Sequence, residues 1–80
     1  MAAAIVLHRA SSTALHRQIY EQWRQGILSG RFRRAERVPS TRELCAELGV
    51  SRSTVTIAYE QLIAEGYLET SRGAGTYVCR

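Results

Sequence analysis

The feature that most constrains the fold of this sequence is a pair of short helical segments with only two residues between them. Ser40 and Glu43 have the spacing of a capping box, in which each side chain accepts a hydrogen bond from the other residue's backbone N–H, and they predict a helix over 41–48. A serine N-cap predicts a further helix over about 51–65. Gly49-Val50 allows only a tight turn between them, and such a turn sets two short helices at a steep angle.

An amphipathic helix is predicted upstream of this pair. Apolar residues at a spacing of four define one face of a helix over about 14–29: Leu15, Ile19, Trp23 and Ile27. Thr13 is the expected N-cap, and Gly26 inside the helix is expected to cost about 1 kcal/mol relative to alanine. Residues 1–13 have no such period, and we interpret them as a flexible N-terminal arm.

The period of the apolar residues changes from helical to alternating after residue 66. Strands are predicted at 67–70 and 76–79, with a glycine-rich turn at 71–75 between them. A short extended stretch is expected at 37–38, because the proline that follows disfavours helical backbone. Three helices followed by a hairpin predict an α+β fold, with a single domain over 14–80.

The charge of the chain points to an acidic partner. All eleven basic residues are arginine, and the net charge is +4. An excess of positive charge favours a polyanionic partner. The planar guanidinium donates paired hydrogen bonds to phosphate and to guanine edges, so double-stranded DNA is a candidate partner. Charge alone does not decide this, because many basic domains bind nothing acidic.

Other classes of function lack the residues that they need. His8 and His16 are the only histidines and aspartate is absent, so no catalytic triad is visible and we do not expect an enzyme. Cys45 and Cys79 lie too far apart for a CxxC zinc site and are expected to be reduced, so no metal or cofactor is expected. The positive charges near the N-terminus follow the apolar run, unlike those of a signal peptide, and no segment is long enough to span a bilayer. We therefore expect a cytoplasmic protein.

The N-terminal end of the second helix of the pair carries polar side chains on the side opposite its apolar stripe. Arg52, Ser53 and Thr56 share this outward side. Ser53, Thr54 and Thr56 are poor helix formers, and contact with DNA gives a reason for their use. Ser51 is expected first as an N-cap, and a helix N-terminus also offers N–H groups to phosphate. This end of the helix is predicted to enter a major groove.

Two further places are candidates for DNA contact. Arg42, at the start of the helix over 41–48, either pairs with Glu43 or Glu47 or contacts phosphate. In the hairpin turn, Arg72 and Gly73 are expected to approach a minor groove or the phosphate backbone, because the glycines of this turn permit positive φ and a close approach.

Five segments of the sequence follow one another in a fixed order with short gaps. They are Val38-Pro39-Ser40-Thr41-Arg42-Glu43-Leu44, Leu48-Gly49-Val50-Ser51-Arg52-Ser53-Thr54-Val55, Ala58-Tyr59-Glu60-Gln61-Leu62, Glu65-Gly66-Tyr67-Leu68 and Gly73-Ala74-Gly75-Thr76-Tyr77-Val78. The series resembles the GntR family of bacterial transcription regulators, and its MocR branch in particular, over about residues 14–79. The resemblance implies a winged helix-turn-helix domain with DNA contacts from Arg42, Ser51, Arg52, Ser53, Thr54, Thr56, Arg72 and Gly73.

The sequence departs from the family pattern at two places, and the resemblance leaves some partners outside this chain. Many members have Pro-Gly in place of Arg34-Ala35, and some have arginine in place of Thr56. In MocR relatives a large aminotransferase-like domain that binds pyridoxal 5′-phosphate follows the module. This chain has no lysine for a Schiff base, so any effector is expected to bind elsewhere. Two copies are expected on a repeated operator, and the alternative function is a winged helix used only for protein contact.

Overall fold

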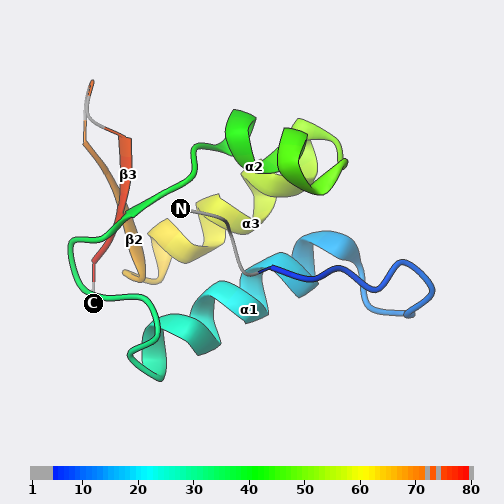
Figure 1. Ribbon diagram of the computed structural model, residues 1–80, viewed down its shortest axis with the longest axis horizontal. Coiled ribbons are helices and arrows are strands. Elements are labelled where there is room, and N and C mark those ends of the chain that lie inside the picture. The colour runs from blue at the N-terminus through cyan, green and yellow to red at the C-terminus, as the bar shows by residue number, and fades with distance from the viewer. Residues whose placement is uncertain (1–4, 72, 74, 80) are drawn as a thin grey trace.

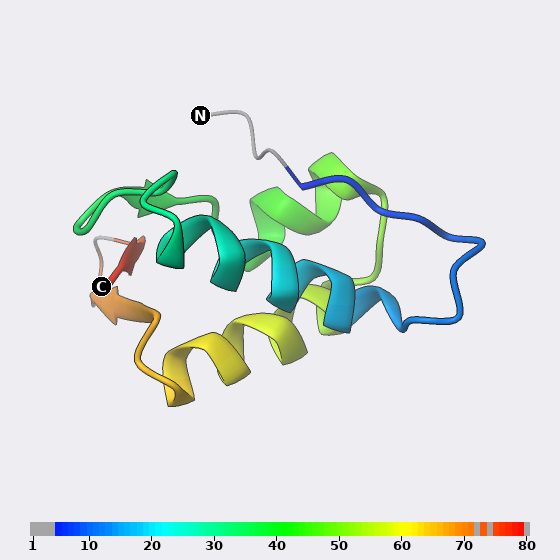
Figure 2. The ribbon, with the colours of Figure 1, turned by 90° about the horizontal axis from the view of Figure 1, so that it is seen from below.

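The computed structural model describes residues 5–71, 73 and 75–79, and its helices and strands follow the predicted order. The elements are α1 (Leu15–Leu28), β1 (Arg37–Val38), α2 (Thr41–Leu48), α3 (Arg52–Ala64), β2 (Leu68–Ser71) and β3 (Gly75–Val78). Helices α1 and α3 lie side by side, α2 packs against α3, and the strands form a small sheet at one end (Figures 1 and 2). The predicted α+β fold is confirmed.

The boundaries of the helices are set by local sequence, with one difference from the prediction. Ser40 and Glu43 form the predicted capping box at the start of α2, with hydrogen bonds of 3.1 and 2.9 Å. Gly49 ends this helix in the left-handed region at φ 68°. The N-cap of α1 is Ala14, without a side-chain hydrogen bond to the helix, so the prediction of Thr13 as N-cap was wrong.

The sheet contains one strand more than the predicted hairpin. Strand β3 is central, and both β1 and β2 pair with it in antiparallel orientation. The extended stretch before Pro39 is strand β1, in which Val38 lies opposite Thr76. Since β1 leads directly toward α2, its pairing fixes the hairpin relative to the helices.

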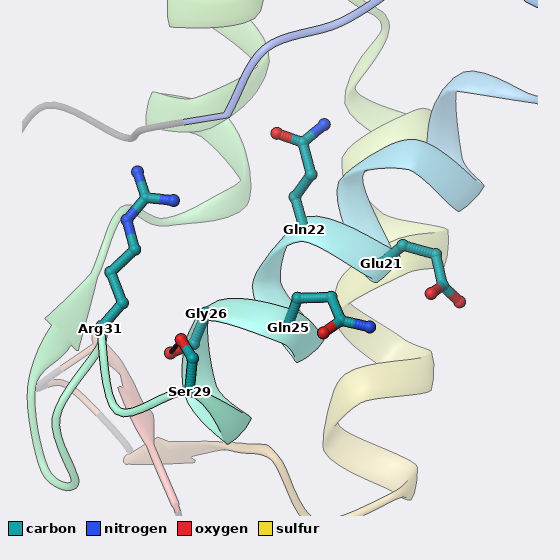
Figure 3. Close-up of a pocket in the computed structure, with 6 residues that line it drawn as sticks. All are labelled: Glu21, Gln22, Gln25, Gly26, Ser29 and Arg31. Atoms are coloured by element: carbon teal, nitrogen blue, oxygen red, sulfur yellow. Dashed lines mark hydrogen bonds between the residues drawn. The ribbon is translucent and has the colours of Figure 1, made fainter.

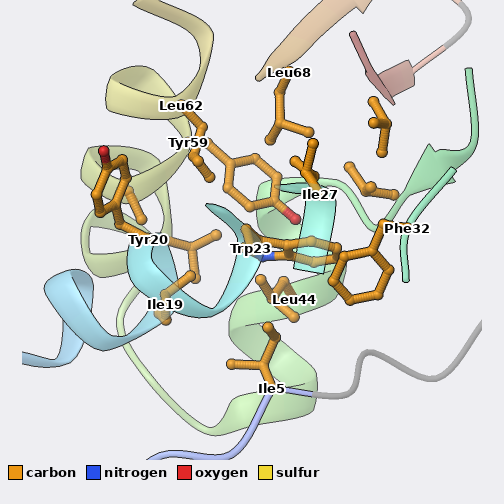
Figure 4. Packing of buried hydrophobic residues seen from close by; sticks show 14 residues of the cluster. Ile5, Ile19, Tyr20, Trp23, Ile27, Phe32, Leu44, Tyr59, Leu62 and Leu68 are labelled. Atoms are coloured by element: carbon orange, nitrogen blue, oxygen red, sulfur yellow. The ribbon is translucent and has the colours of Figure 1, made fainter. Parts of the chain in front are cut away.

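Apolar side chains from all three helices and the sheet form one core (Figure 4). The largest fully buried side chains are Trp23, Ile19, Leu44, Leu62, Leu68, Val38, Val55 and Val78. The ring of Trp23 lies against Phe32, with centroids 4.7 Å apart, and contacts Tyr59 edge-on at 6.3 Å. The Tyr59 hydroxyl donates a 2.7 Å hydrogen bond to the Pro39 carbonyl oxygen, which ties α3 to the chain before α2.

Candidate nucleic-acid interface

Three hydroxyl side chains gather at the N-terminal end of α3. Ser51 caps the helix as predicted, because its Oγ accepts a 3.3 Å hydrogen bond from the Thr54 backbone N–H. The same oxygen lies 2.8 Å from Thr54 Oγ1 and 3.1 Å from Ser53 Oγ. Ser51 and Ser53 are exposed, whereas Thr54 is half-buried. The hydroxyls therefore form one polar surface around the first-turn N–H groups, where a helix attracts anions.

The side of α3 that faces away from the core carries donors and acceptors next to one another. Arg52 and Ser53 are exposed and Thr56 is half-buried, whereas the opposite side of the helix is buried at Val55, Ala58, Tyr59 and Leu62. Thr56 Oγ1 donates a 2.9 Å hydrogen bond to the Arg52 carbonyl oxygen, so the hydrogen of Thr56 is used within the helix and its oxygen remains an acceptor. The Arg52 guanidinium supplies donors only. Base edges in a major groove present both donors and acceptors, so this face has the chemistry to bind them.

Arg42 is exposed in the first turn of α2. Glu43, one of the two glutamates considered as its partner, closes the capping box and lies 3.5 Å from Arg37 Nη2 instead. The Ser40 backbone N–H and hydroxyl, with a further contribution from the Arg37 charge, hold the pKa of Glu43 below its usual value. The contact of Arg42 with phosphate stays a prediction.

The turn between β2 and β3 has the glycine conformations that the sequence indicates. Gly73 has φ 75°, and no described atom lies within 4 Å of the position that a Cβ would take there. Arg72 lies outside the described residues, so its contact with DNA stays a prediction. The hairpin tip, α2 and the N-terminal end of α3 all lie on the upper side of Figure 1, and α1 lies on the lower side. This arrangement leaves the Gly73 backbone open to a partner on the same side as α2.

Arg37 joins the hairpin to α2, and sequence reasoning missed it. It lies on β1 opposite Tyr77 of β3. A Cβ on Gly75 would lie 3.0 Å from Arg37 Nε, so the Arg37 side chain covers β3 where it leaves the turn, while its guanidinium reaches Glu43. The spacing of these residues along the chain gives no signal, because the contact depends on the pairing of β1 with β3.

Comparison with known proteins decides the family of this domain. The family model for "Bacterial regulatory proteins, gntR family" matches residues 15–78, which is most of the chain. The chain belongs to the GntR family. The resemblance found in the sequence segments is thereby confirmed.

Relatives of this GntR-family domain include regulators that are much longer. It is 47% identical over 74 residues to the probable rhizopine catabolism regulatory protein MocR of Rhizobium meliloti, and the match covers 92% of this chain and 15% of that protein. The structure of YtrA from Sulfolobus acidocaldarius, a GntR-family transcription factor, is similar with a TM-score of 0.85 and 32% identity over 98% of this chain and 81% of that one. The structure of the AraR DNA-binding domain in complex with operator ORE1 has a TM-score of 0.75 and 29% identity over 91% of this chain and 89% of that one. The predicted winged helix-turn-helix fold is confirmed.

The surface of the GntR-family domain also has a pocket away from the N-terminal end of α3. A shallow pocket on α1 and the segment that follows it is lined by Glu21, Gln22, Gln25, Gly26, Ser29 and Arg31 (Figure 3). Within residues 5–71, 73 and 75–79, no three histidine, cysteine or acidic side chains come together as metal ligands. In the same residues, no helix has both the length and the apolar character needed to cross a bilayer.

Proposed function

We propose that this GntR-family domain binds duplex DNA as the operator-reading module of a bacterial transcription regulator. The N-terminal end of α3 enters the major groove, and the hairpin turn lies on the minor groove or the phosphate backbone. The observation that carries the proposal is the outward, polar end of α3, where Arg52, Ser53 and Thr56 project from a helix whose other side is fully buried.

The proposed contact residues form two groups, those that contact bases in the major groove and those that contact the DNA backbone or the minor groove. Arg52 donates to a base edge, for which guanine O6 and N7 are the best-matched acceptors, and Ser53 and Thr56 contact neighbouring bases. Ser51 caps α3 through the Thr54 N–H, and the hydroxyls of Ser51 and Thr54 contact a phosphate at the positive end of the helix. Arg42 of α2 and the turn residues Arg72 and Gly73 contact the DNA backbone or minor groove: these positions fix the register of α3 in the groove.

The similarity to AraR supports DNA over the alternative of a protein-only role. The AraR domain has been solved with operators ORE1 and ORX1, at TM-scores of 0.75 and 0.77 to this chain. A winged helix that contacts only protein has no need of an arginine beside hydroxyl side chains at the start of α3. Catalysis is not part of the proposed function, since the relatives are named as transcription regulators.

We further propose that two copies occupy one operator, each on its own half-site. A single small module buries only about 600–1,000 Å² on DNA, which limits its affinity. Sedimentation on a selected operator checks the pairing, and one copy bound at saturation would contradict it.

An effector would bind outside this chain, which spans 15% of the length of MocR. The proposed operator binding would take place in the bacterial cytoplasm, where the chromosome lies.

Binding to duplexes selected from a random library tests the function directly. Anisotropy titrations are expected to show binding whose log K falls linearly with log salt concentration. Arg52→Ala is expected to weaken binding to the selected duplex by about 1–3 kcal/mol, with much less effect on a random duplex. Arg17→Ala is the matched control, because it removes one exposed arginine from α1, where it pairs with Glu21 at 3.1 Å.

Two outcomes would contradict the proposal or part of it. Absence of salt-dependent binding to any duplex would reject DNA binding and favour the protein-only role. Equal losses for Arg52→Ala on selected and random duplexes would make Arg52 a phosphate contact instead of a base contact.

A further inference from the structure

The segment before α1 is held against the helix by glutamine side chains that pair with its backbone. Gln22 donates to the Val6 carbonyl oxygen at 2.7 Å and accepts from the Val6 N–H at 2.9 Å. Gln18, one helical turn earlier, makes the same pair of bonds to His8, at 3.0 and 2.8 Å. Residues two apart in an extended chain point their backbone groups the same way, so the two glutamines act like a neighbouring strand.

Apolar side chains anchor the same segment. Ile5 is 6% exposed and belongs to the core cluster that includes Leu44 of α2 (Figure 4). Leu7 packs against that cluster while partly exposed. Residues 5–8, which belong to the stretch predicted as a flexible arm, therefore contact both the core and α1. These contacts fix the position of the backbone at Arg9.

That next residue, Arg9, binds the turn between α2 and α3. Its Nη2 donates to the Leu48 carbonyl oxygen at 3.0 Å and to the Gly49 carbonyl oxygen at 3.1 Å. A cation at this place also complements the negative end of the α2 dipole. The Cys45 carbonyl oxygen accepts from the N–H groups of both Gly49 and Val50. The Arg9 guanidinium donates to two carbonyl oxygens further along the chain, those of Leu48 and Gly49.

We propose that Arg9 is a positioning residue for DNA recognition, which sets the angle of α3 by fixing the Leu48 and Gly49 peptide groups. Only Gly49 and Val50 separate α2 from the Ser51 cap, so any rotation of these peptide groups turns the N-terminal end of α3. Arg9 acts through the turn and does not itself contact DNA. The proposal rests on the proposed DNA-binding function.

Arg9→Ala tests the proposal, with Arg17→Ala as the control for loss of one exposed positive charge. Affinity for the selected duplex is expected to fall about tenfold, since the variant loses hydrogen bonds from a charged donor. Affinity for a random duplex and the slope of log K against log salt are expected to stay unchanged. Gln22→Ala, which loosens the segment but retains the Arg9 side chain, is expected to give a smaller loss of the same kind.

Amide hydrogen exchange separates positioning from a general loss of stability. In Arg9→Ala, the Val50 and Thr54 amides are expected to exchange faster, while the amide of Tyr20 in α1 is unchanged. This measurement needs no DNA, so it distinguishes failure of the Arg9 role from failure of the DNA-binding function. Faster exchange at all three amides would make Arg9 merely structural.

Three binding outcomes would overturn the positioning role. A slope reduced by about 0.9 on both duplexes would show a direct phosphate contact by Arg9. Equal losses on both duplexes with an unchanged slope would show a loss of folded protein. Unchanged affinity on both duplexes, in a wild-type background that binds the selected duplex, would show that the turn does not need Arg9.

Discussion

Replacement of Gly26 by alanine is expected to destabilise the domain, although helix propensity alone predicts a gain. Alanine is more favourable than glycine inside a helix by about 1 kcal/mol. Gly26 is buried in α1, however, and a Cβ there would lie 2.2 Å from Phe32 Cε2 and 2.4 Å from Phe32 Cδ2. These distances are far inside van der Waals contact, so the Phe32 ring would have to leave its place.

The size of the effect follows from what the Phe32 ring contacts. The ring is 5% exposed and lies 4.7 Å from the Trp23 ring, centroid to centroid. Overpacking of a core costs about 1–3 kcal/mol, and the depth of this overlap places Gly26→Ala near 3 kcal/mol. After the gain in helix propensity of about 1 kcal/mol, a net loss of about 2 kcal/mol in the free energy of unfolding remains.

Urea denaturation followed by Trp23 fluorescence measures this loss, and a net 2 kcal/mol corresponds to a Tm lower by roughly 8–16 °C. The control is the same change in a Phe32→Ala background, where the ring is gone and Gly26→Ala is expected to stabilise the domain by about 1 kcal/mol. A stabilising effect of Gly26→Ala in the wild-type background would refute the reasoning.

Two further predictions concern acid stability and the hairpin. The Tyr20 hydroxyl donates a hydrogen bond to the Glu65 carboxylate, and this bond, together with one from Gln61, lowers the pKa of Glu65. The stability contributed by the ionised Glu65 is therefore fully present above its unfolded pKa of about 4.3. It is lost as the pH falls from that value through the lower pKa of the folded state. Urea midpoints are expected to decline below about pH 4 and to decline less in Glu65→Gln; equal declines would contradict this. Gly75→Ala is expected to cost about 1–3 kcal/mol in urea denaturation, because φ is 109° and the new Cβ would meet Arg37 at 3.0 Å. An unchanged midpoint would show that the hairpin adapts.

The parts of the interface that lie within one helix turn were predictable. The Ser51 cap and the outward side shared by Arg52, Ser53 and Thr56 follow from spacing along α3, and the structure has both. The parts that connect separate elements were not predictable. The pairing of β1 with β3 brings Arg37 to Gly75, and no spacing in the sequence indicates that pairing. The contacts of the predicted residues with DNA stay predictions.

The sequence by itself determined where α2 and α3 begin and which face of α1 is buried, because a cap or an apolar period acts through hydrogen bonds and packing between residues a few positions apart. Only the tertiary structure decided what Gly26 and Arg9 do. A glycine that looks unfavourable makes room for Phe32, and an arginine in a segment without a period binds the turn beside α3. The sign of each effect depends on a partner brought close by the packing of the whole core, and local sequence does not encode that distance.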